Sequence, residues 1–313
     1  MKALAIILTC VFFASLIGFI ITTAVTGVRW DNNFRIGWGS PVRLASTPHD
    51  ATYNFTDSYS DIEISTTSAR TAIKVSRDGN TRVEYKGDNP NLEFTAEIKG
   101  NALIIRERIT ATGGLWGWGW NWGWNSWTQG VLNIEIPEDF YNKTYISITS
   151  GKMSGELPYT DNLYLNVTSG NVNLDYNHGN AAHHLKSHTT SGTVTLNGFR
   201  PDTYDIYSTS GTQRISGLTG SGSVRLTSGT INVDFDEWNG SLSVNITSGR
   251  VNITAPSGSG ADLNFSRTSG SMSYNMDGDS GRLSGRSTLS IGGANKQSVR
   301  IDMTSGSASI TTR

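Results

Sequence analysis

Four histidines lie close together in this chain of 313 residues, at His178, His183, His184 and His188. Imidazole is a common metal ligand, so the cluster suggests a metal site. However, alignment with neighbouring segments turns Leu185 inward, and an extended strand then separates His184 from His188 by about 13 Å. One zinc ion holds its nitrogen ligands at about 2.0–2.1 Å. Unless a loop gathers His178 and His183, the sequence predicts no metal site, and it indicates no other cofactor.

A pair of aspartates offers a second kind of chemistry. Asp234 and Asp236 alternate along an expected strand and lie about 6.6 Å apart, within the separation of paired carboxylates in glycoside hydrolases. Glu237 and Trp238 follow in what we expect to be an exposed turn. The equivalent position in other segments is mostly neutral and polar, and holds Asp175, Asn197, Ser216, Thr254, Asn275 and Thr311. Such a row is typical of a solvated face, so we predict that the chain is not an enzyme.

Tryptophan is concentrated in one segment. Six of the nine tryptophans lie there, at Trp116, Trp118, Trp120, Trp122, Trp124 and Trp127. The first five alternate with glycine or asparagine, so an extended chain would place their rings on one side over roughly 26 Å. Tryptophan favours interfaces because its ring is apolar while its N–H group still forms a hydrogen bond. We therefore expect a Trp/Gly-rich insertion at residues 113–128 that binds a membrane, a partner protein or a glycan.

Three interpretations of this insertion are open. The rings could pack back on the rest of the protein as a cap, because large exposed apolar patches are unusual without a partner. They could dock on a bilayer surface or a partner protein, because a short tether after residue 28 would hold them near a membrane. They could also stack on sugar rings, although the segment offers only Asn121 and Asn125 to bind hydroxyl groups.

The elements that must position these residues are repeated along the chain. The tripeptide Thr-Ser-Gly occurs eight times, with its glycine at Gly151, Gly170, Gly192, Gly211, Gly229, Gly249, Gly270 and Gly306. Successive motifs up to Gly270 are 18 to 22 residues apart. We interpret the last gap, of 36 residues, as two periods with an eroded motif near Ile291. A fixed period of this length is the signature of a repeat protein.

Apolar residues alternate with polar ones on both sides of each motif. Leu163, Leu165 and Val167 precede one copy, and Val172 and Leu174 follow it. Alternation with a period of two predicts strands with one buried face. The alternation slips by one residue across Thr-Ser-Gly, so we interpret the motif as a corner at which glycine can adopt positive φ.

A unit of about 20 residues cannot bury its apolar face alone, whereas stacked units share a core. We therefore predict an all-β fold, a single-stranded β-solenoid (β-helix) over residues 50–313, with irregular first layers that include Ile62 to Val75. From Gly151 to Gly306 we expect nine layers, and the chain ends within the last one. The open edge of that layer makes end-to-end self-association a hypothesis. A sandwich of antiparallel hairpins is the alternative fold.

Composition and charge restrict the location and the partners. The net charge is −1 with only 16% charged residues, and no basic stripe indicates nucleic acid. Residues 3–28 form one apolar run, long enough for a helix across a bilayer, which needs about 20 residues. We predict a transmembrane anchor or uncleaved signal at residues 1–28 and a linker at 29–49, with a cleaved signal peptide as the alternative. A single cysteine, Cys10, excludes an intramolecular disulfide and fits a bacterial envelope protein.

The stretch from Val131 to Pro137, then Tyr141 to Thr144 and Ile146 to Gly151, followed by the Thr-Ser-Gly layers, resembles the bacterial putative-adhesin family of unknown function. The resemblance covers residues 50–313 and implies a β-solenoid that is often tied to a membrane segment, with no catalytic motif. Some members belong to envelope-stress operons of Gram-positive bacteria.

Taken with the composition, the resemblance leads us to expect a non-enzymatic, single-pass protein of the bacterial cell membrane with its solenoid on the extracytoplasmic side. It would act by binding, in adhesion or in envelope organisation. One alternative is an envelope-stress accessory protein that senses the membrane or antimicrobial peptides. Another, from a different class, is a polysaccharide-active enzyme on a β-helix.

Overall fold

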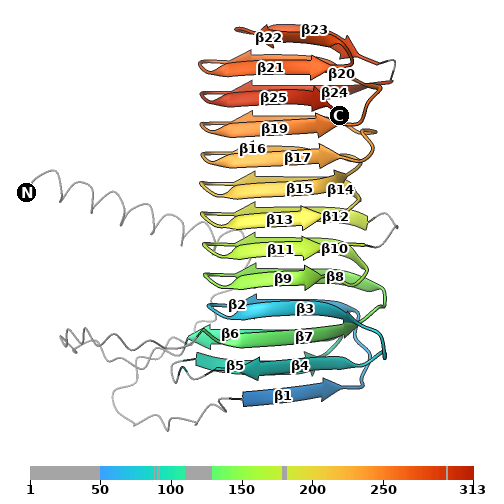
Figure 1. The fold of residues 1–313 in the computed structure, drawn as a ribbon, viewed down its shortest axis with the longest axis vertical. Helices are drawn as coiled ribbons and strands as arrows, with labels where there is room; N and C mark the ends of the chain where they lie inside the picture. Colours follow the sequence, from blue (N-terminus) through green and yellow to red (C-terminus); the bar gives the residue numbers. More distant parts are fainter. Residues whose placement is uncertain (1–49, 88, 90–91, 110–128, 178–181, 294) are drawn as a thin grey trace, which may run out of the picture. The chain divides into compact units, whose positions relative to one another are not determined.

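The computed structural model of the protein describes residues 50–313 except residues 88, 90–91, 110–128, 178–181 and 294. All helices and strands assigned in these residues are β-strands, which form two long sheets around one core (Figure 1). The prediction of an all-β repeat fold is confirmed. The described residues contain no helix that is long and apolar enough to cross a membrane. The predicted anchor at 3–28, the linker at 29–49 and the tryptophan segment lie outside the described residues.

One sheet has 13 strands. In their order across the sheet they are β1 (Asp50–Phe55), β4 (Thr81–Lys86), β7 (Val131–Pro137), β3 (Arg70–Ser76), β9 (Lys152–Glu156), β11 (Asn171–Asp175), β13 (Thr193–Asn197), β15 (Thr212–Leu218), β17 (Thr230–Phe235), β19 (Arg250–Ala255), β25 (Ser307–Thr312), β21 (Ser271–Met276) and β22 (Asp279–Leu283).

The facing sheet has 12 strands. In order they are β23 (Ser287–Gly292), β20 (Ser259–Arg267), β24 (Asn295–Met303), β18 (Leu242–Ile246), β16 (Ser221–Leu226), β14 (Pro201–Ser208), β12 (Ala182–Thr189), β10 (Thr160–Val167), β8 (Tyr141–Ile148), β2 (Asp61–Thr66), β6 (Ala102–Ile109) and β5 (Leu92–Lys99).

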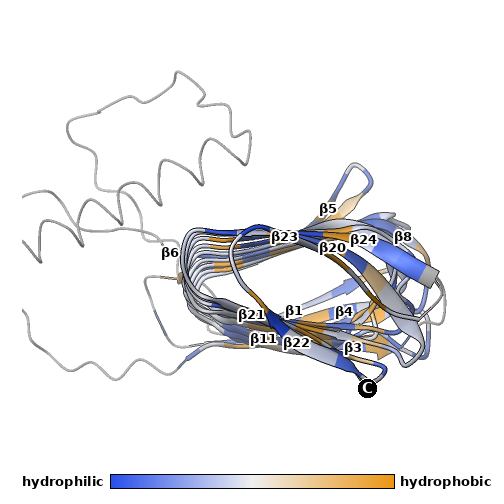
Figure 2. Cartoon of the chain, turned by 90° about the horizontal axis from the view of Figure 1, so that it is seen from above, coloured by the Kyte–Doolittle hydropathy of each residue, from blue (hydrophilic) through white to orange (hydrophobic). Residues whose placement is uncertain are grey.

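Each central layer contributes one strand to each sheet, and equivalent residues stack in parallel register. Leu163 of β10 pairs with Leu185 of β12, and Val172 of β11 pairs with Val194 of β13. All four of these side chains are buried. The buried apolar side chains of both sheets form one core cluster, and Figure 2 views the two facing sheets along the stack. One continuous core therefore stabilises layers that could not bury their apolar faces singly.

Thr-Ser-Gly lies between the two strands of each central layer, and its backbone continues the ladder from one layer to the next. Ser169 N donates to Thr149 O at 2.7 Å, and Asn171 N donates to Gly151 O at 3.0 Å. A Cβ atom on Gly192 would lie 2.2 Å from the carbonyl oxygen of Gly170, a distance that real Cβ atoms do not adopt. Close stacking of backbones therefore requires glycine at Gly192, whereas Gly229, Gly249, Gly270 and Gly306 also adopt the predicted positive φ.

The two ends of the stack depart from the predicted order. The layer of β24 and β25 lies inside the stack, because β25 pairs with both β19 and β21. The expectation that the chain ends in an open last layer is therefore wrong, and it no longer supports end-to-end self-association. The predicted eroded motif is also wrong, since Ile291 lies in β23, which runs antiparallel to β20. Periodicity reveals the repeat unit, but it does not reveal the order in which units stack.

The first corner of the stack, Thr67-Ser68-Ala69, is closed by a carboxylate. Glu107 Oε2 accepts hydrogen bonds from the backbone N–H groups of Thr67, Ser68 and Ala69 at 2.9, 2.8 and 2.9 Å. Tyr85 Oη donates to Glu107 Oε1 at 3.3 Å. In later layers, carbonyl groups of the preceding layer accept the hydrogen bonds from the Thr and Ser N–H groups, as Ile148 O and Thr149 O do for Thr168 and Ser169. Glu107 takes their place because β6 leads into the connection that holds the predicted tryptophan insertion instead of a Thr-Ser-Gly corner.

Candidate binding surface

The two carboxylates that suggested hydrolysis are held by arginines. Arg313 Nη2 lies 2.6 Å from Asp234 Oδ1 and 3.5 Å from Asp236 Oδ1. Arg200 Nη2 lies 2.9 Å from Asp236 Oδ2. Both carboxylates are therefore already paired with guanidinium groups of this chain.

The expectation of an exposed turn at Trp238 is wrong. Its side chain is only 6% exposed, and its ring stacks on that of Phe235 with the centroids 5.3 Å apart. The indole packs into the core next to the last residue of β17, a position at which the alternation of the strand gave no signal.

The outer face of the 13-stranded sheet consists of polar side chains that bind one another along the stack. Asn252 Nδ2 donates to Asn232 Oδ1 at 2.7 Å, and Ser309 Oγ donates to Asn252 Oδ1 at 2.9 Å. Asn197 Nδ2 likewise donates to Asp175 Oδ1 at 2.7 Å. These ladders use hydrogen-bonding groups that a ligand would need. They agree with the prediction of a solvated polar face.

The outer face of the 12-stranded sheet carries rings on four neighbouring strands. We call this set the aromatic patch, and it consists of Tyr145 on β8, Tyr164 on β10, His184 and His188 on β12, and Tyr207 on β14. Tyr145 and Tyr164 are in register, as are His188 and Tyr207. All five side chains are partly exposed, while residues between them, such as Leu185, are buried.

The rings of the patch contact one another and a lysine. The His188 and Tyr207 rings are stacked, with centroids 4.8 Å apart, and those of Tyr164 and His184 are 5.9 Å apart. Lys143 Nζ lies 5.1 Å from the centroid of the Tyr164 ring, a cation–π arrangement. Burial lowers the pKa of His188, with a further contribution from the nearby Lys186 ammonium group. Burial also lowers the pKa of His184, so both imidazoles are neutral at neutral pH.

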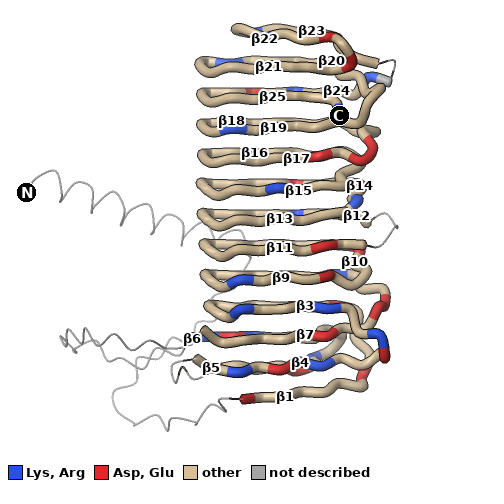
Figure 3. Tube along the Cα trace, in the orientation of Figure 1, with Lys and Arg blue, Asp and Glu red and all other residues tan. Residues whose placement is uncertain are grey.

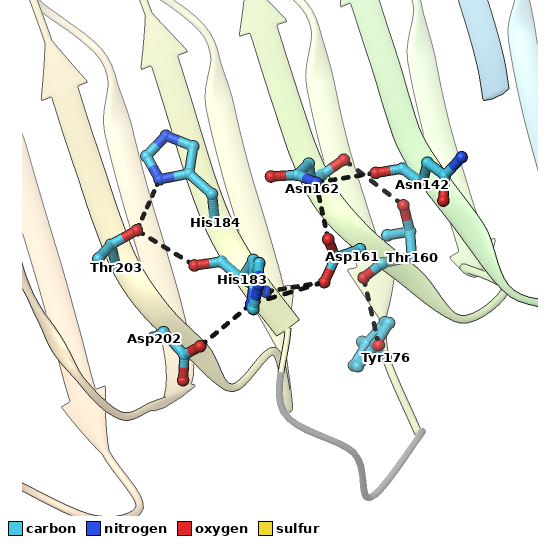
Figure 4. Close-up of polar contacts among 9 residues, drawn as sticks. All are labelled: Asn142, Thr160, Asp161, Asn162, Tyr176, His183, His184, Asp202 and Thr203. Carbon is cyan, nitrogen blue, oxygen red and sulfur yellow. Dashed lines mark hydrogen bonds and ion pairs between the residues drawn. The ribbon is translucent and has the colours of Figure 1, made fainter.

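A polar row borders the patch where β8, β10, β12 and β14 begin (Figure 4). Thr203 Oγ1 donates to His183 O at 3.1 Å and lies 2.9 Å from His184 Nδ1. Because the hydroxyl has one hydrogen, it accepts from His184 Nδ1–H, which leaves Nε2 as an acceptor. His183 Nδ1 lies 3.2 Å from Asp202 Oδ2 and 3.9 Å from Asp161 Oδ1.

The lysines and the arginines of this face differ in their ion-pair partners. Arg225 contacts Asp205 at 3.0 Å, and Arg106 contacts Glu63 at 2.9 Å. Among the described residues, no carboxylate forms an ion pair with Lys143 or Lys186. Charged residues elsewhere are scattered over the stack without a continuous stripe of one sign (Figure 3). The patch therefore combines exposed rings with two cations that have no carboxylate partner in the described part of the chain.

Other candidate sites in the described ranges are weaker. The His, Cys, Asp and Glu residues that the structure describes form no group of three that could hold a metal. A pocket of about 300 Å³ lies between β18, β20 and β24, and one of about 180 Å³ lies beside Arg82 and Glu135. Neither pocket is lined by an aromatic ring. Arg82 and Glu135 are moreover paired with each other at 3.1 Å.

Fold and surface together define a repeat-type β protein with one aromatic outer face. The chain belongs to the Toastrack DUF4097 family, whose model matches residues 59–311. This confirms the family resemblance found in the sequence. Among curated proteins, none matches the chain.

Three solved structures are among those to which the chain is similar. A putative adhesin from Bacteroides fragilis is 12% identical over 84% of this chain and 98% of its own, with a TM-score of 0.47. A putative adhesin from Parabacteroides distasonis is 11% identical over 83% of this chain and 96% of its own, with a TM-score of 0.46. A putative lipid binding protein from the same species is 14% identical over 86% of this chain and 98% of its own, with a TM-score of 0.44.

Proposed function

We propose that this chain is a non-enzymatic protein of the bacterial cell envelope that acts by binding, in adhesion or envelope organisation, through the aromatic patch. The observation that carries the proposal is the contrast between the two outer faces. One face is a set of self-bonded polar ladders, whereas the other presents five partly exposed rings on four neighbouring strands. Clusters of partly exposed aromatic rings are typical of contact surfaces.

Two further features support this function. The carboxylate pair closest to a hydrolase geometry, Asp234 and Asp236, is bound by Arg313 and Arg200, which favours binding over catalysis. The apolar run at residues 3–28 has the length of a single membrane span. In the proposed arrangement it holds the protein at the membrane as a single-pass anchor, with the repeat domain on the extracytoplasmic side.

Sedimentation with bacterial envelope fragments tests the proposal. We expect the full chain, in non-ionic detergent, to sediment with the fragments, and the double variant Tyr164→Ala/Tyr207→Ala to bind at least tenfold more weakly. Phe140→Ala is the matched control, because Phe140 is 47% exposed but lies outside the patch. Equal sedimentation of the wild type and the double variant would show that another surface binds. Failure of the wild type to sediment would refute the function itself.

A further inference from the structure

Resting on the proposed function, we propose that the aromatic patch binds an acidic polysaccharide whose chain runs along the stack, across β8, β10, β12 and β14. The inference names the ligand class of the same surface. It depends on three properties of the patch, which are the spacing of its rings, its two cations without carboxylate partners, and the hydrogen-bonding groups at its border.

The rings form two pairs that each cross neighbouring strands and are offset from each other by two residues along the strands. Tyr145 and Tyr164 lie directly opposite each other on neighbouring parallel strands, as do His188 and Tyr207. Neighbouring strands are about 4.8 Å apart, so the two pairs together extend over four strands, with Lys186 next to Tyr164 and Asn166 next to His188. A tyrosine ring offers an apolar face and a hydroxyl group. A linear chain of sugar rings has matching faces, with apolar C–H groups and hydroxyls, and it is long enough to contact both pairs of rings.

The positive charge of Lys143 and Lys186 beside the aromatic patch favours an acidic sugar over a neutral one. Lys143 lies over the ring of Tyr164. Lys186 is directly opposite Tyr164 on the neighbouring strand, so Tyr164 and Lys186 belong to one column of residues across the sheet. The acidic residue that follows Lys186 in that column, Asp205, is bound by Ser223 and Arg225 at 2.6 and 3.0 Å. The two ammonium groups are therefore left to pair with carboxylates of a ligand.

The border of the patch supplies partners for hydroxyl groups. His184 Nε2 is an acceptor, because Nδ1 donates to Thr203. Asn166 is in register with His188 and partly exposed. The nearby carboxylates are already engaged, since Asp161 contacts Asn162 and His183, and Asp202 contacts His183.

Other macromolecules fit this surface less well. The large hydrophobic side chains that are exposed in the described residues are Ile109, Val131 and Phe140, and none lies in the patch. An apolar bilayer or a hydrophobic protein interface would need such anchors. Nucleic acid would need many more cations than two lysines in a chain of net charge −1.

Affinity electrophoresis tests the ligand class. The full chain, in non-ionic detergent, would run in native gels that contain polygalacturonate, dextran or polyglutamate. We expect retardation by polygalacturonate alone. We expect at least tenfold weaker retention for Tyr164→Ala and for Lys143→Gln/Lys186→Gln. The matched control is Lys152→Gln/Arg214→Gln, which removes two exposed cations from the outer face of the other sheet and should bind like the wild type.

Four other outcomes overturn the inference, and a fifth overturns the proposed function alone. Equal retention by polyglutamate would show that charge alone acts, and equal retention by dextran would show that the lysines do not select the ligand. Retention that survives both patch variants would locate binding elsewhere. If envelope sedimentation depends on the patch but polygalacturonate is not bound, the ligand class is wrong and the proposed function stands. If polygalacturonate is bound through the patch but envelopes are not, the proposed function fails while the ligand chemistry holds.

Discussion

Removing the carboxylate of Glu107 should destabilise the first layers of the stack. Its side chain is 3% exposed, and Oε2 accepts three backbone hydrogen bonds at the corner Thr67-Ser68-Ala69. A hydrogen bond to a charged group contributes about 1.5–3 kcal/mol. Water can replace part of this at Thr67 and Ser68, which are only partly buried. We therefore expect Glu107→Ala to lower the free energy of unfolding by about 3–5 kcal/mol, and Glu107→Gln by about half of that, because its neutral amide oxygen still accepts.

Thermal unfolding followed by circular dichroism, together with hydrogen exchange, measures this effect. For a domain of this size, 1 kcal/mol shifts Tm by about 2–4 °C, so Glu107→Ala should lower Tm by roughly 6–20 °C. The amides of Thr67, Ser68 and Ala69 should lose protection first, because layers of a repeat protein contact only their neighbours. Glu97→Ala, at an exposed position of β5, is the control. If Glu107→Ala and Glu97→Ala unfold alike, the carboxylate does not hold the corner and the reasoning is refuted.

Three further predictions concern the corner, the patch and the tryptophan segment. Gly192→Ala should lower the free energy of unfolding by more than about 2 kcal/mol, since its Cβ atom would lie 2.2 Å from a carbonyl oxygen. Denaturant titration measures this, with Ser191→Ala as the control. Equal stability of both variants and the wild type would contradict the prediction. Burial lowers the pKa of His188, so the unfolded chain takes up the proton first as pH falls, and stability is lost below the unfolded pKa of about 6.5. Replacing His188 by Gln should therefore reduce the fall in Tm between pH 7.5 and 5.5, and an unchanged slope would contradict this. If the tryptophan segment anchors the protein at a membrane interface, a chain that lacks residues 1–29 should co-sediment with liposomes. The same chain should lose this binding when five tryptophans are changed to Ser, at Trp116, Trp118, Trp120, Trp122 and Trp124.

The repeat and its buried face could be predicted from the sequence because they are local. Alternation around Val167 and Val172 requires only neighbouring residues, and both side chains are buried as predicted. The order of layers at the ends could not be predicted in the same way. The position of β25 between β19 and β21 depends on contacts between residues far apart in the chain, and each layer has a similar pattern, so the sequence does not distinguish its neighbours.

The aromatic patch was missed although the sequence held a signal for it. Tyr145 and Tyr164 stand four residues before the threonine of their motifs, and His188 and Tyr207 stand two residues before theirs. These are outward positions in every layer, so rings there in consecutive repeats face the same side. The spacing of His184 and His188 within one strand carries no information about the neighbouring strands. Only the register of β8, β10, β12 and β14 brings the rings together with Lys143 and Lys186.

Hydroxyl-radical footprinting of the full chain, with and without bacterial envelope fragments, tests most directly whether the protein acts by binding through this face. The account predicts that the fragments protect Tyr145, Tyr164, His188 and Tyr207, while Phe140 reacts equally in both samples. Protection confined to other residues, or no change at the four rings when the chain is bound, would contradict it.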